Sequence, residues 1–381
     1  MSMDRRGFLG AATLLAAPQV TFAQAATERR FIFIIQRGAA DGLNIVIPYA
    51  EPAYASLRGQ LAIDPAAALK LDGTFALHPA LPRLRELYAG GEATLLHAVA
   101  SPYRDRSHFD AQNVLESGGM SPYQLKDGWM NRLLGMLPRS GKDAIAFSPA
   151  VPLAMQGAAE VTTYAPSTLP EANEDLLMRV KQLYAPDRQL HALWTSALEA
   201  RGMAGERMGG GNRQDGAALG RIAAGFLARA DGPRIAMIET SGWDTHSGQD
   251  ARLATQLRGL DGLIGGLCEG MGATWAETVV IVATEFGRTV AANGTGGTDH
   301  GTAAAAIVVG GAVQGGRIVA DWPGLAPGNL YEGRDLRPTL ALDTVIASTC
   351  AEAFKLDPER TAKVLFPGVD WRHKMPRLLR I

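Results

Sequence analysis

The sequence predicts an α/β fold in which helices flank a parallel β-sheet. Apolar runs of strand length alternate with helical stretches, and polar, glycine-containing loops separate them, which is the pattern of parallel strands joined by helices. The 381 residues are 47% hydrophobic, enough for one large core or two modest ones. Because the alternation resumes after an irregular middle segment, we expect one domain over residues 26–381.

The first half of this domain is predicted to form two strand–helix pairs. Residues 29–36, RRFIFIIQ, are a continuous apolar run, and residues 77–91 form a helix that ends at paired glycines. Residues 92–100, EATLLHAVA, are the next buried strand, and a helix follows from Ser107 to Gly118. Strand-to-helix succession of this kind favours a parallel sheet.

The pattern loosens in the middle of the chain and then returns. Residues from about 120 to 215 contain proline-rich segments and two helical stretches, at about 171–184 and 188–201, and we interpret them as an insertion in the same domain. The later elements are three strands, at residues 234–240, 277–284 and 303–311, and one long amphipathic helix at residues 251–270.

Residues 1–25 have the pattern of a twin-arginine export signal. Arg5 and Arg6 precede Phe8 and Leu9, a short apolar run follows, and small residues form a cleavage site. The run is shorter than the roughly 20 residues of a membrane span, and Pro18 interrupts it. We expect a cleaved signal, a periplasmic or secreted protein, and no stable membrane span.

Bulk charge excludes one class of partner. Lys and Arg number 37 against 38 Asp and Glu, a net charge of −1, so the basic surplus of a nucleic-acid-binding protein is missing. The cysteines Cys268 and Cys350 lie in apolar helical settings, and we interpret them as buried free thiols, although an oxidising compartment would permit one bridge.

Acids and histidines gather in loops that directly follow strand-like runs. In an open parallel sheet, ligands bind beyond the carboxyl ends of the strands, so residues that are distant in sequence can meet there. The residues in these loops are Asp41, Asp244, His246, Glu285, Arg288, Asp299 and His300. His97, by contrast, lies inside an apolar strand and is interpreted as a core histidine.

The residue types in these loops suit divalent cations. Two loops pair an aspartate with a histidine, and carboxylate oxygen with imidazole nitrogen suits Zn²⁺ or Mn²⁺. Asp41 and Glu285 follow the two most apolar strands and could share a second, oxygen-only site for Mg²⁺, Mn²⁺ or Ca²⁺. Taken singly, each pair also fits a hydrogen-bonded loop, and each acid fits a turn or helix cap.

Ser107 has two interpretations. It stands where a serine caps a helix, and a hydroxyl at a helix N-terminus can also act as a nucleophile toward an anion held by backbone N–H groups. Arg288 could complement that anion, whereas Arg104 and Arg106 fit a solvated surface.

Several segments in order carry a resemblance to a known family. They are the export signal, RGAADGLNIVIPYAEPAYASLRGQLAI, LHPAL, SHFDAQNVLESG, GWDTHSGQ, TEFGRTVAANGTGGTDHG, GGRIVADWPGL and LYEGRDL. Together they resemble domain of unknown function family number 1501, a group of exported bacterial proteins in the alkaline-phosphatase-like and sulfatase-like superfamily. The resemblance spans nearly all of the mature chain.

The resemblance implies a doubly wound sheet sandwiched by helices, with a two-cation site at the strand ends. In this superfamily a Ser, Thr or modified Cys at a helix start attacks phosphorus or sulfur. Asp41 then resembles the first-strand aspartate and Ser107 the nucleophile, with Ser101 as a competitor. The remaining ligands would be Asp244, His246 and His300 for one cation, and Glu285 for the other.

Two departures from the superfamily pattern weaken the second cation site. The usual Asp-x-x-x-His is Asp-x-His here, and Phe286 replaces the imidazole that normally follows the late-strand acid. One site is then complete, while the other has oxygen ligands only. Asp299 either serves as a ligand or orients His300.

We therefore expect an exported metal-dependent hydrolase of phosphate or sulfate esters, or of related anionic esters, carried on a small molecule or a polymer. Ser107 would be activated by cation coordination, and Arg288 or helix N–H groups would steady the anion. The alternative is an exported binding or assembly protein that keeps one structural cation without turnover, and Phe286 favours it.

The export assignment predicts the behaviour of a double substitution. Changing Arg5 and Arg6 to lysine should leave uncleaved precursor inside the cell, because the twin-arginine pair is the recognised part of the signal. Fractionation and immunoblotting of periplasm and cytoplasm measure this. Normal periplasmic delivery of the double variant would refute the assignment.

Overall fold

The computed structural model describes residues 28–138, 143–165, 215–369 and 375–380, with short stretches between 180 and 195. The predicted signal at residues 1–25 and most of the two helical stretches expected at about 171–201 lie outside the described residues. Within the described part, no helix is long and apolar enough to cross a membrane.

A nine-stranded sheet forms the centre of the molecule, and its strand order is β11-β5-β10-β9-β1-β8-β6-β7, with β12 beside β5. All its pairings are parallel except those of β10, which is antiparallel to both neighbours. The strands are β1 Arg30–Arg37, β5 Ala93–Ala100, β6 Ala144–Phe147, β7 Thr162–Thr163, β8 Ile235–Ser241, β9 Thr278–Thr284, β10 Ala304–Val309, β11 Arg317–Val319 and β12 Leu340–Ala341.

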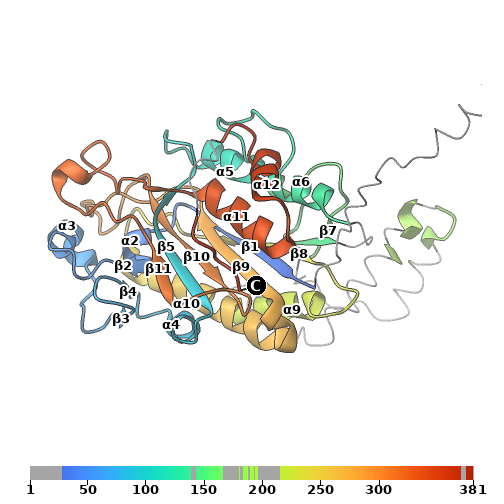
Figure 1. Ribbon diagram of the computed structural model, residues 1–381, viewed down its shortest axis with the longest axis horizontal. Coiled ribbons are helices and arrows are strands. Elements are labelled where there is room, and N and C mark those ends of the chain that lie inside the picture. The colour runs from blue at the N-terminus through green and yellow to red at the C-terminus, as the bar shows by residue number, and fades with distance from the viewer. Residues whose placement is uncertain are drawn as a thin grey trace, which may run out of the picture.

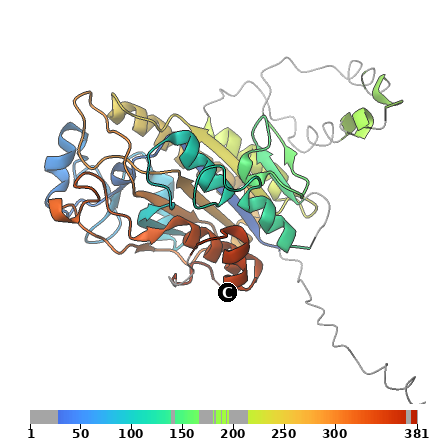
Figure 2. The same ribbon diagram turned by 90° about the horizontal axis from the view of Figure 1, so that it is seen from above.

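Helices cover both faces of this sheet (Figure 1), which confirms the predicted α/β class. On one face lie α4 Pro82–Ala89, α9 Gly216–Leu227 and α10 Gln249–Met271. On the other lie α5 His108–Ser117, α6 Trp129–Met136, α11 Leu342–Phe354 and α12 Pro358–Leu365. Seen from above, the teal α5 and the red α11 and α12 lie over the strands (Figure 2).

The middle of β1 is apolar because both of its faces are covered. In β1, Phe31, Phe33 and Ile35 pack on the α6 and α11 side. The alternate residues Ile32 and Ile34 pack on the α9 and α10 side. Successive side chains of a strand point to opposite faces, so a stretch that is covered on both sides is apolar at consecutive positions.

A small subdomain adjoins one end of the main sheet (Figure 1). Its three-stranded sheet has the order β2-β4-β3. The elements here are α2 Gly42–Ile45, β2 Val46–Ile47, α3 Tyr54–Arg58, β3 Leu69–Lys70 and β4 Ala76–Leu77. The 3₁₀ turn η2 Gly59–Leu61 follows α3. The other 3₁₀ turns of the described residues are η3 Leu153–Met155, η4 Gly272–Glu277 and η5 Pro327–Asn329.

The segment at residues 120–215, expected to be an insertion, contributes α6, β6 and β7 in its described part. Strand β6 pairs in parallel with β8, and β7 pairs with β6. This portion of the segment therefore extends the main sheet at one edge.

The antiparallel direction of β10 shows that one expectation from the sequence was wrong. Asp299 and His300 were expected to follow a strand, but they precede β10. Because β10 runs against β9 and β5, its first residues lie beside the last residues of its neighbours. The loop therefore reaches the predicted edge from the opposite direction.

His97 and Cys350 are buried as predicted, whereas Cys268 in α10 is only half-buried. Both thiols are free. The His97 ring is fully buried in β5, where its Nε2 donates to the Val46 carbonyl at 2.8 Å. Burial lowers the pKa of His97 to about 4.

This buried histidine predicts an acid-dependent loss of stability. Between pH 6.5 and 4 the unfolded chain binds a proton at His97 that the folded chain does not, so the free energy of unfolding falls by about 1.4 kcal/mol per pH unit, about 3 kcal/mol in all. The non-titrating variant His97→Gln should be less stable than wild type at pH 7, and the difference should narrow toward pH 4. Urea unfolding across this range tests it, and parallel stability curves would contradict it.

Candidate metal centre

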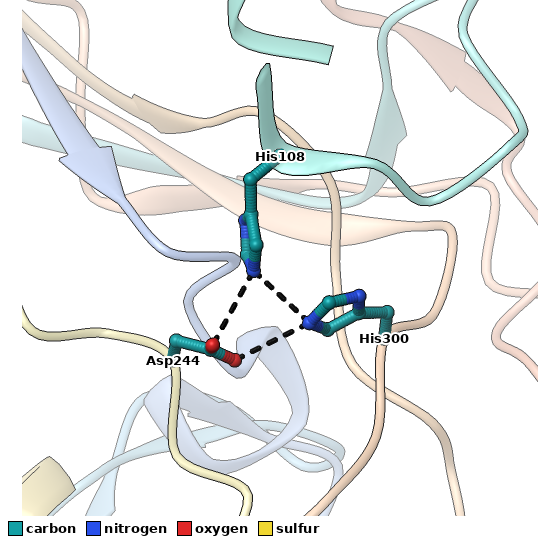
Figure 3. Close-up of side chains that lie close together, drawn as sticks. All are labelled: His108, Asp244 and His300. Carbon is teal, nitrogen blue, oxygen red and sulfur yellow. Dashed lines mark hydrogen bonds and ion pairs between the residues drawn. The ribbon is translucent and has the colours of Figure 1, made fainter. Parts of the chain in front are cut away.

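Three side chains from separate parts of the chain meet at the carboxyl edge of the sheet (Figure 3). His108 begins α5, Asp244 lies after β8, and His300 lies before β10. Their ligand atoms all lie within 4.8 Å of one another. The Nε2 atoms of the two histidines are 3.0 Å apart, and an Asp244 oxygen lies 3.5 Å from His108 Nε2 and another 3.4 Å from His300 Nε2.

His246 brings a third imidazole to this cluster. Its Nε2 is 3.0 Å from Nε2 of His300 and 3.0 Å from Oδ1 of Asp244. Its side chain is 44% exposed, against 23% for His108 and 26% for His300. His246 is therefore the most solvent-accessible of the three imidazoles.

The other ring nitrogen, Nδ1, of each of these histidines meets an acceptor. The acceptors are Glu285 Oε1 for His108 at 2.8 Å, the Arg106 carbonyl for His300 at 3.0 Å, and Asp299 Oδ1 for His246 at 3.2 Å. Carboxylates and carbonyls only accept hydrogen bonds, so Nδ1 carries the proton in each ring. In the neutral form of each ring, Nε2 is then an unprotonated nitrogen with a free lone pair.

Three such nitrogens and a carboxylate face one another, so no ring can donate a hydrogen bond to another while all three are neutral. A single proton can join only one pair of nitrogens, whereas one cation attracts all of them. Around Zn²⁺ with bonds of about 2.0–2.1 Å, tetrahedral ligand nitrogens lie about 3.3 Å apart, close to the spacing found here. The residues fit a divalent cation of the Zn²⁺ or Mn²⁺ type.

The carboxylates of the site are held in their ionised form. Burial alone would raise the pKa of Glu285, but hydrogen bonds from His108, Gln112 and the backbone bring it below its usual value. Burial also opposes ionisation of Asp244, and the hydrogen bond and charge of Arg288 lower its pKa.

The pKa values of two of the histidines are shifted in opposite directions. The hydrogen bond to Glu285 raises the pKa of His108. Burial and the neighbouring His108 lower the pKa of His300. His300 is thus disposed to stay neutral, as a metal ligand must be.

Glu285 supports the cluster from behind. Its side chain is 0% exposed, and Oε1 accepts from the Gly38 N–H at 2.8 Å, from His108 at 2.8 Å and from Gln112 at 3.1 Å. Oε2 lies 3.0 Å from the Thr284 hydroxyl, whose single proton it shares with the Gln36 carbonyl at 2.7 Å. Both oxygens of this predicted ligand therefore face protein donors.

Asp41 is also engaged with protein groups. Its carboxylate forms an ion pair with Arg58 and accepts from Gln249 and from the Leu43 N–H at the start of α2. Asp41 and Arg58 are 1% and 0% exposed. A guanidinium thus supplies the positive charge that a second cation would supply here.

Arg288 holds Asp244 in place. The guanidinium is buried, donates to Asp244 Oδ1 at 2.5 Å, and also donates to the Thr298 hydroxyl at 3.1 Å and to the Thr298 carbonyl. Three of its donors therefore point at protein groups, and one of these is a residue of the cluster.

The two candidate nucleophiles differ in their surroundings. Ser107 occupies the cap position of α5 with extended backbone, but its side chain makes no capping hydrogen bond. Ser101 is 4% exposed, and its hydroxyl donates to the Glu285 carbonyl at 3.5 Å. Of the two, Ser107 directly precedes a residue of the cluster, His108.

Arg104 and Arg106 do not lie on a solvated surface, contrary to the expectation from sequence. Arg104 is half-buried and donates to the carbonyls of Ser101 and Tyr103. Arg106 pairs with the buried Asp335 at 2.8 Å. The loop between β5 and α5 uses these side chains to fix its own backbone.

Phe286 forms an apolar wall beside the cluster. Its ring is 3% exposed, stacks on His108 with centroids 4.9 Å apart, and lies 5.2 Å from the His300 ring. It restricts the movement of both imidazoles and offers no ligand atom.

His108 is the residue that sequence reasoning missed. Asp105 and Asp110 lie on either side of it, but the sequence favours a helix capped by Ser107 here and not a ligand loop after a strand. The available signal was its position, because it opens a helix directly after Ser107 and follows the strand that ends at Ala100. A strand-to-helix turn of a parallel sheet lies at the carboxyl edge.

The chain belongs to the family described as a protein of unknown function, DUF1501, whose model matches residues 92–365. No curated protein sequence matches it significantly. The resemblance to this family inferred from the sequence is thereby confirmed.

Solved structures with a similar fold include Ps i-CgsB in complex with k-i-k-neocarrahexaose, at 11% identity and a TM-score of 0.44, over 88% of this chain and 74% of that one. A mutant TAB5 alkaline phosphatase with bound Mg has 12% identity and a TM-score of 0.39, over 87% and 99%. BT1596, a 2-O GAG sulfatase, has 9% identity and a TM-score of 0.39, over 91% and 76%. At such identities these similarities concern the fold alone.

The cluster predicts the effect of single substitutions on metal affinity. Chelator-stripped protein should bind Zn²⁺ or Mn²⁺, and Asp299→Ala should weaken binding about 10- to 100-fold because it only orients an imidazole. His108→Ala and His300→Ala should weaken it more, since each removes a ligand. Isothermal titration measures this, with the remote His191→Ala as the matched control. Binding by His300→Ala as tight as that of wild type would show that the cluster is only a hydrogen-bonded clasp.

Proposed function

We propose that the protein is a metal-dependent hydrolase of phosphate or sulfate esters, or of related anionic esters. The observation that carries this proposal is the convergence of three imidazole Nε2 atoms and Asp244 beside the start of α5. The proposed holders of the cation are His108, His246, His300 and Asp244. When bound, a Zn²⁺ or Mn²⁺ ion would supply Lewis acidity and positive charge for an anionic ester.

The residues around the cluster fix its protonation state and orientation. Glu285 and the Arg106 carbonyl hold the Nδ1 protons of His108 and His300, which directs both Nε2 atoms into the cluster. Asp299 does the same for the more exposed His246. Arg288 neutralises part of the Asp244 charge and keeps its carboxylate in place.

Ser107 is the proposed nucleophile. Its hydroxyl makes no capping hydrogen bond, so it is free to react. The first-turn N–H groups and the positive dipole end of α5 lie next to this hydroxyl, where they can attract an anion. An anionic ester held there would face the hydroxyl. Each nearby imidazole has one nitrogen engaged with an acceptor and the other in the cluster, so none is left to act as a general base for Ser107.

The donor set favours one cation over two. Asp41 is neutralised by Arg58, and both oxygens of Glu285 accept hydrogen bonds from protein groups. An oxygen-only site at these residues would require breaking a buried ion pair, which costs about 3–5 kcal/mol. The Mg²⁺, Mn²⁺ or Ca²⁺ site expected from sequence is therefore left out of the proposal.

One observation favours the non-catalytic alternative. Phe286 packs against two rings of the cluster and limits the room beside them. In that case the cation would stabilise the loops of an exported binding or assembly protein. The substrate we propose for the hydrolase is a small-molecule or polymer-linked anionic ester in the periplasm. Measured turnover of such an ester distinguishes the hydrolase from the non-catalytic protein.

The hydrolase proposal predicts that Ser107→Ala abolishes turnover without loss of metal. Metal-loaded wild type should hydrolyse at least one of a panel of aryl phosphates, aryl sulfates and phosphodiesters. Ser107→Ala should reduce the rate at least about 100-fold, because the nucleophile is lost while the ligands remain. Ser101→Ala is the matched control and should retain the rate.

Metal content and initial rates are measured on the same preparations. A stoichiometric metal load with no turnover across the whole panel would favour the structural-cation alternative. Full activity in Ser107→Ala would instead exclude Ser107 as the nucleophile.

A further inference from the structure

A buried carboxylate outside the metal cluster connects the segments around His300. Asp335 lies in the loop between η5 and β12 and is 0% exposed. Its Oδ2 lies 2.9 Å from Nε and 2.8 Å from Nη2 of Arg106, and it accepts from the Thr302 hydroxyl at 2.8 Å. Its Oδ1 accepts from Nε of Arg334 at 2.9 Å. One carboxylate therefore joins the turn before α5, the residues before β10 and its own loop.

The contact with Arg106 reaches the imidazole of His300 through the main chain. The Arg106 carbonyl accepts from His300 Nδ1 at 3.0 Å. Arg106 has a φ of 60°, a left-handed conformation that a residue with a side chain keeps only when its surroundings hold it. Its guanidinium is held by the exposed Glu332 and by the buried Asp335. Because water screens the pair with Glu332, the pair with Asp335 is the stronger of the two.

The contact with Arg334 reaches the main chain of the same histidine. Arg334 donates through Nη2 to the His300 carbonyl at 2.6 Å, and Asp335 holds its Nε. The Arg334 side chain is 45% exposed, so without this carboxylate it would be free to turn into water. Asp335 thus holds two arginines, one that orients the ring of His300 and one that holds its backbone.

The direction of the Arg106 carbonyl decides which nitrogen of His300 carries the proton. Among the described residues, this carbonyl is the acceptor that Nδ1 meets. If it turned away, the proton would be better placed on Nε2, which lies 3.4 Å from Asp244 and 3.0 Å from His108 Nε2. A nitrogen that carries a proton has no lone pair for a cation, so that tautomer removes Nε2 from the cluster.

We infer that Asp335 is a positioning residue for His300, which acts through Arg106 and Arg334 and does not touch the metal cluster. It keeps the proton of His300 on Nδ1 and leaves Nε2 free to bind a cation. This gives a role to the segment LYEGRDL, residues 330–336, whose acid was not among the candidate site residues. The effect on ion affinity rests on the proposed metal centre, whereas the tautomer of the ring can be measured without an ion.

The substitution Asp335→Asn, which preserves size, tests this role. The amide oxygen can accept from one arginine, but the amide N–H groups then face the other guanidinium, so at least one contact is lost. Ring NMR of the metal-free mature protein with isotope-labelled histidine, at neutral pH, should show one Nδ1–H tautomer of His300 in wild type and a mixture of tautomers in the variant. Isothermal titration should show Zn²⁺ or Mn²⁺ affinity about 10- to 100-fold weaker.

Asp261→Asn is the matched control. Asp261 is also a buried carboxylate, 7% exposed, and it accepts from the N–H groups of Arg83 and Leu84 at the start of α4, on the opposite face of the sheet from α5. Both variants should unfold at a lower temperature than wild type. Asp261→Asn should nevertheless keep the His300 tautomer and the ion affinity, which a general loss of stability does not change.

Three substitutions of arginine test the two contacts separately and remain informative if Asp335→Asn does not fold. Arg106→Gln retains the carbonyl that His300 binds but loses the ion pair with Asp335, so it should also give a mixture of tautomers. Arg334→Gln should weaken ion affinity roughly 2- to 10-fold through loss of one hydrogen bond. Arg337→Gln is the control for both, because its guanidinium binds two main-chain carbonyls away from the cluster, and it should behave as wild type.

Asp335 is not a positioning residue if folded Asp335→Asn keeps the single Nδ1–H tautomer or binds the ion as tightly as wild type. Where that variant does not fold, wild-type behaviour of both Arg106→Gln and Arg334→Gln leads to the same conclusion. In either case ion binding by wild type leaves the metal centre standing. If wild type binds neither ion, the metal centre of the proposed function fails, and the His300 tautomer alone decides the role of Asp335.

Discussion

The buried carboxylate of Glu285 is the constraint on which the site depends. A charge with no exposed surface is tolerated only when hydrogen bonds replace its hydration. Its donors come from the turn after β1, from two residues of α5 and from β9 itself, so satisfying one carboxylate fixes three elements relative to one another. Gln112 is in turn oriented by Arg37, which donates to its amide oxygen at 2.9 Å. With its Nδ1 held by Glu285, His108 can direct only Nε2 at Asp244 and His300.

A second buried charge, on Asp41, is resolved in a different way. Arg58 neutralises it and also donates hydrogen bonds to the carbonyls of Thr289 and Val290 and to the side chain of Asn44. The Asp41 carboxylate thus has its charge partner within the protein, whereas the unprotonated Nε2 atoms of the histidine cluster could hold a cation. This asymmetry between a satisfied and an unsatisfied set of polar atoms is the physical basis for proposing one metal ion.

Backbone geometry contributes as much as side-chain chemistry. Arg106 has a φ of 60°, a left-handed conformation that is unusual for a residue with a side chain, and its carbonyl accepts from His300. The buried Asp335 holds its guanidinium and also accepts from the Thr302 hydroxyl. The strained turn before α5 thus links the helix that carries His108 to the loop that carries His300.

The sequence by itself determined the α/β class, the buried strands, the core position of His97 and the presence of polar loops at one edge, because these follow from hydrophobic periodicity and turn residues. It also identified Asp244, His246 and His300, which have an acid and an imidazole in one loop. Only the tertiary structure decided the partners of each side chain. The ion pair of Asp41 with Arg58, the role of Glu285 behind His108 and the reversed direction of β10 join positions that are distant along the chain. Local patterns do not encode such contacts, since the same loop acid can bind a cation, an arginine or an imidazole according to what the packed fold places beside it.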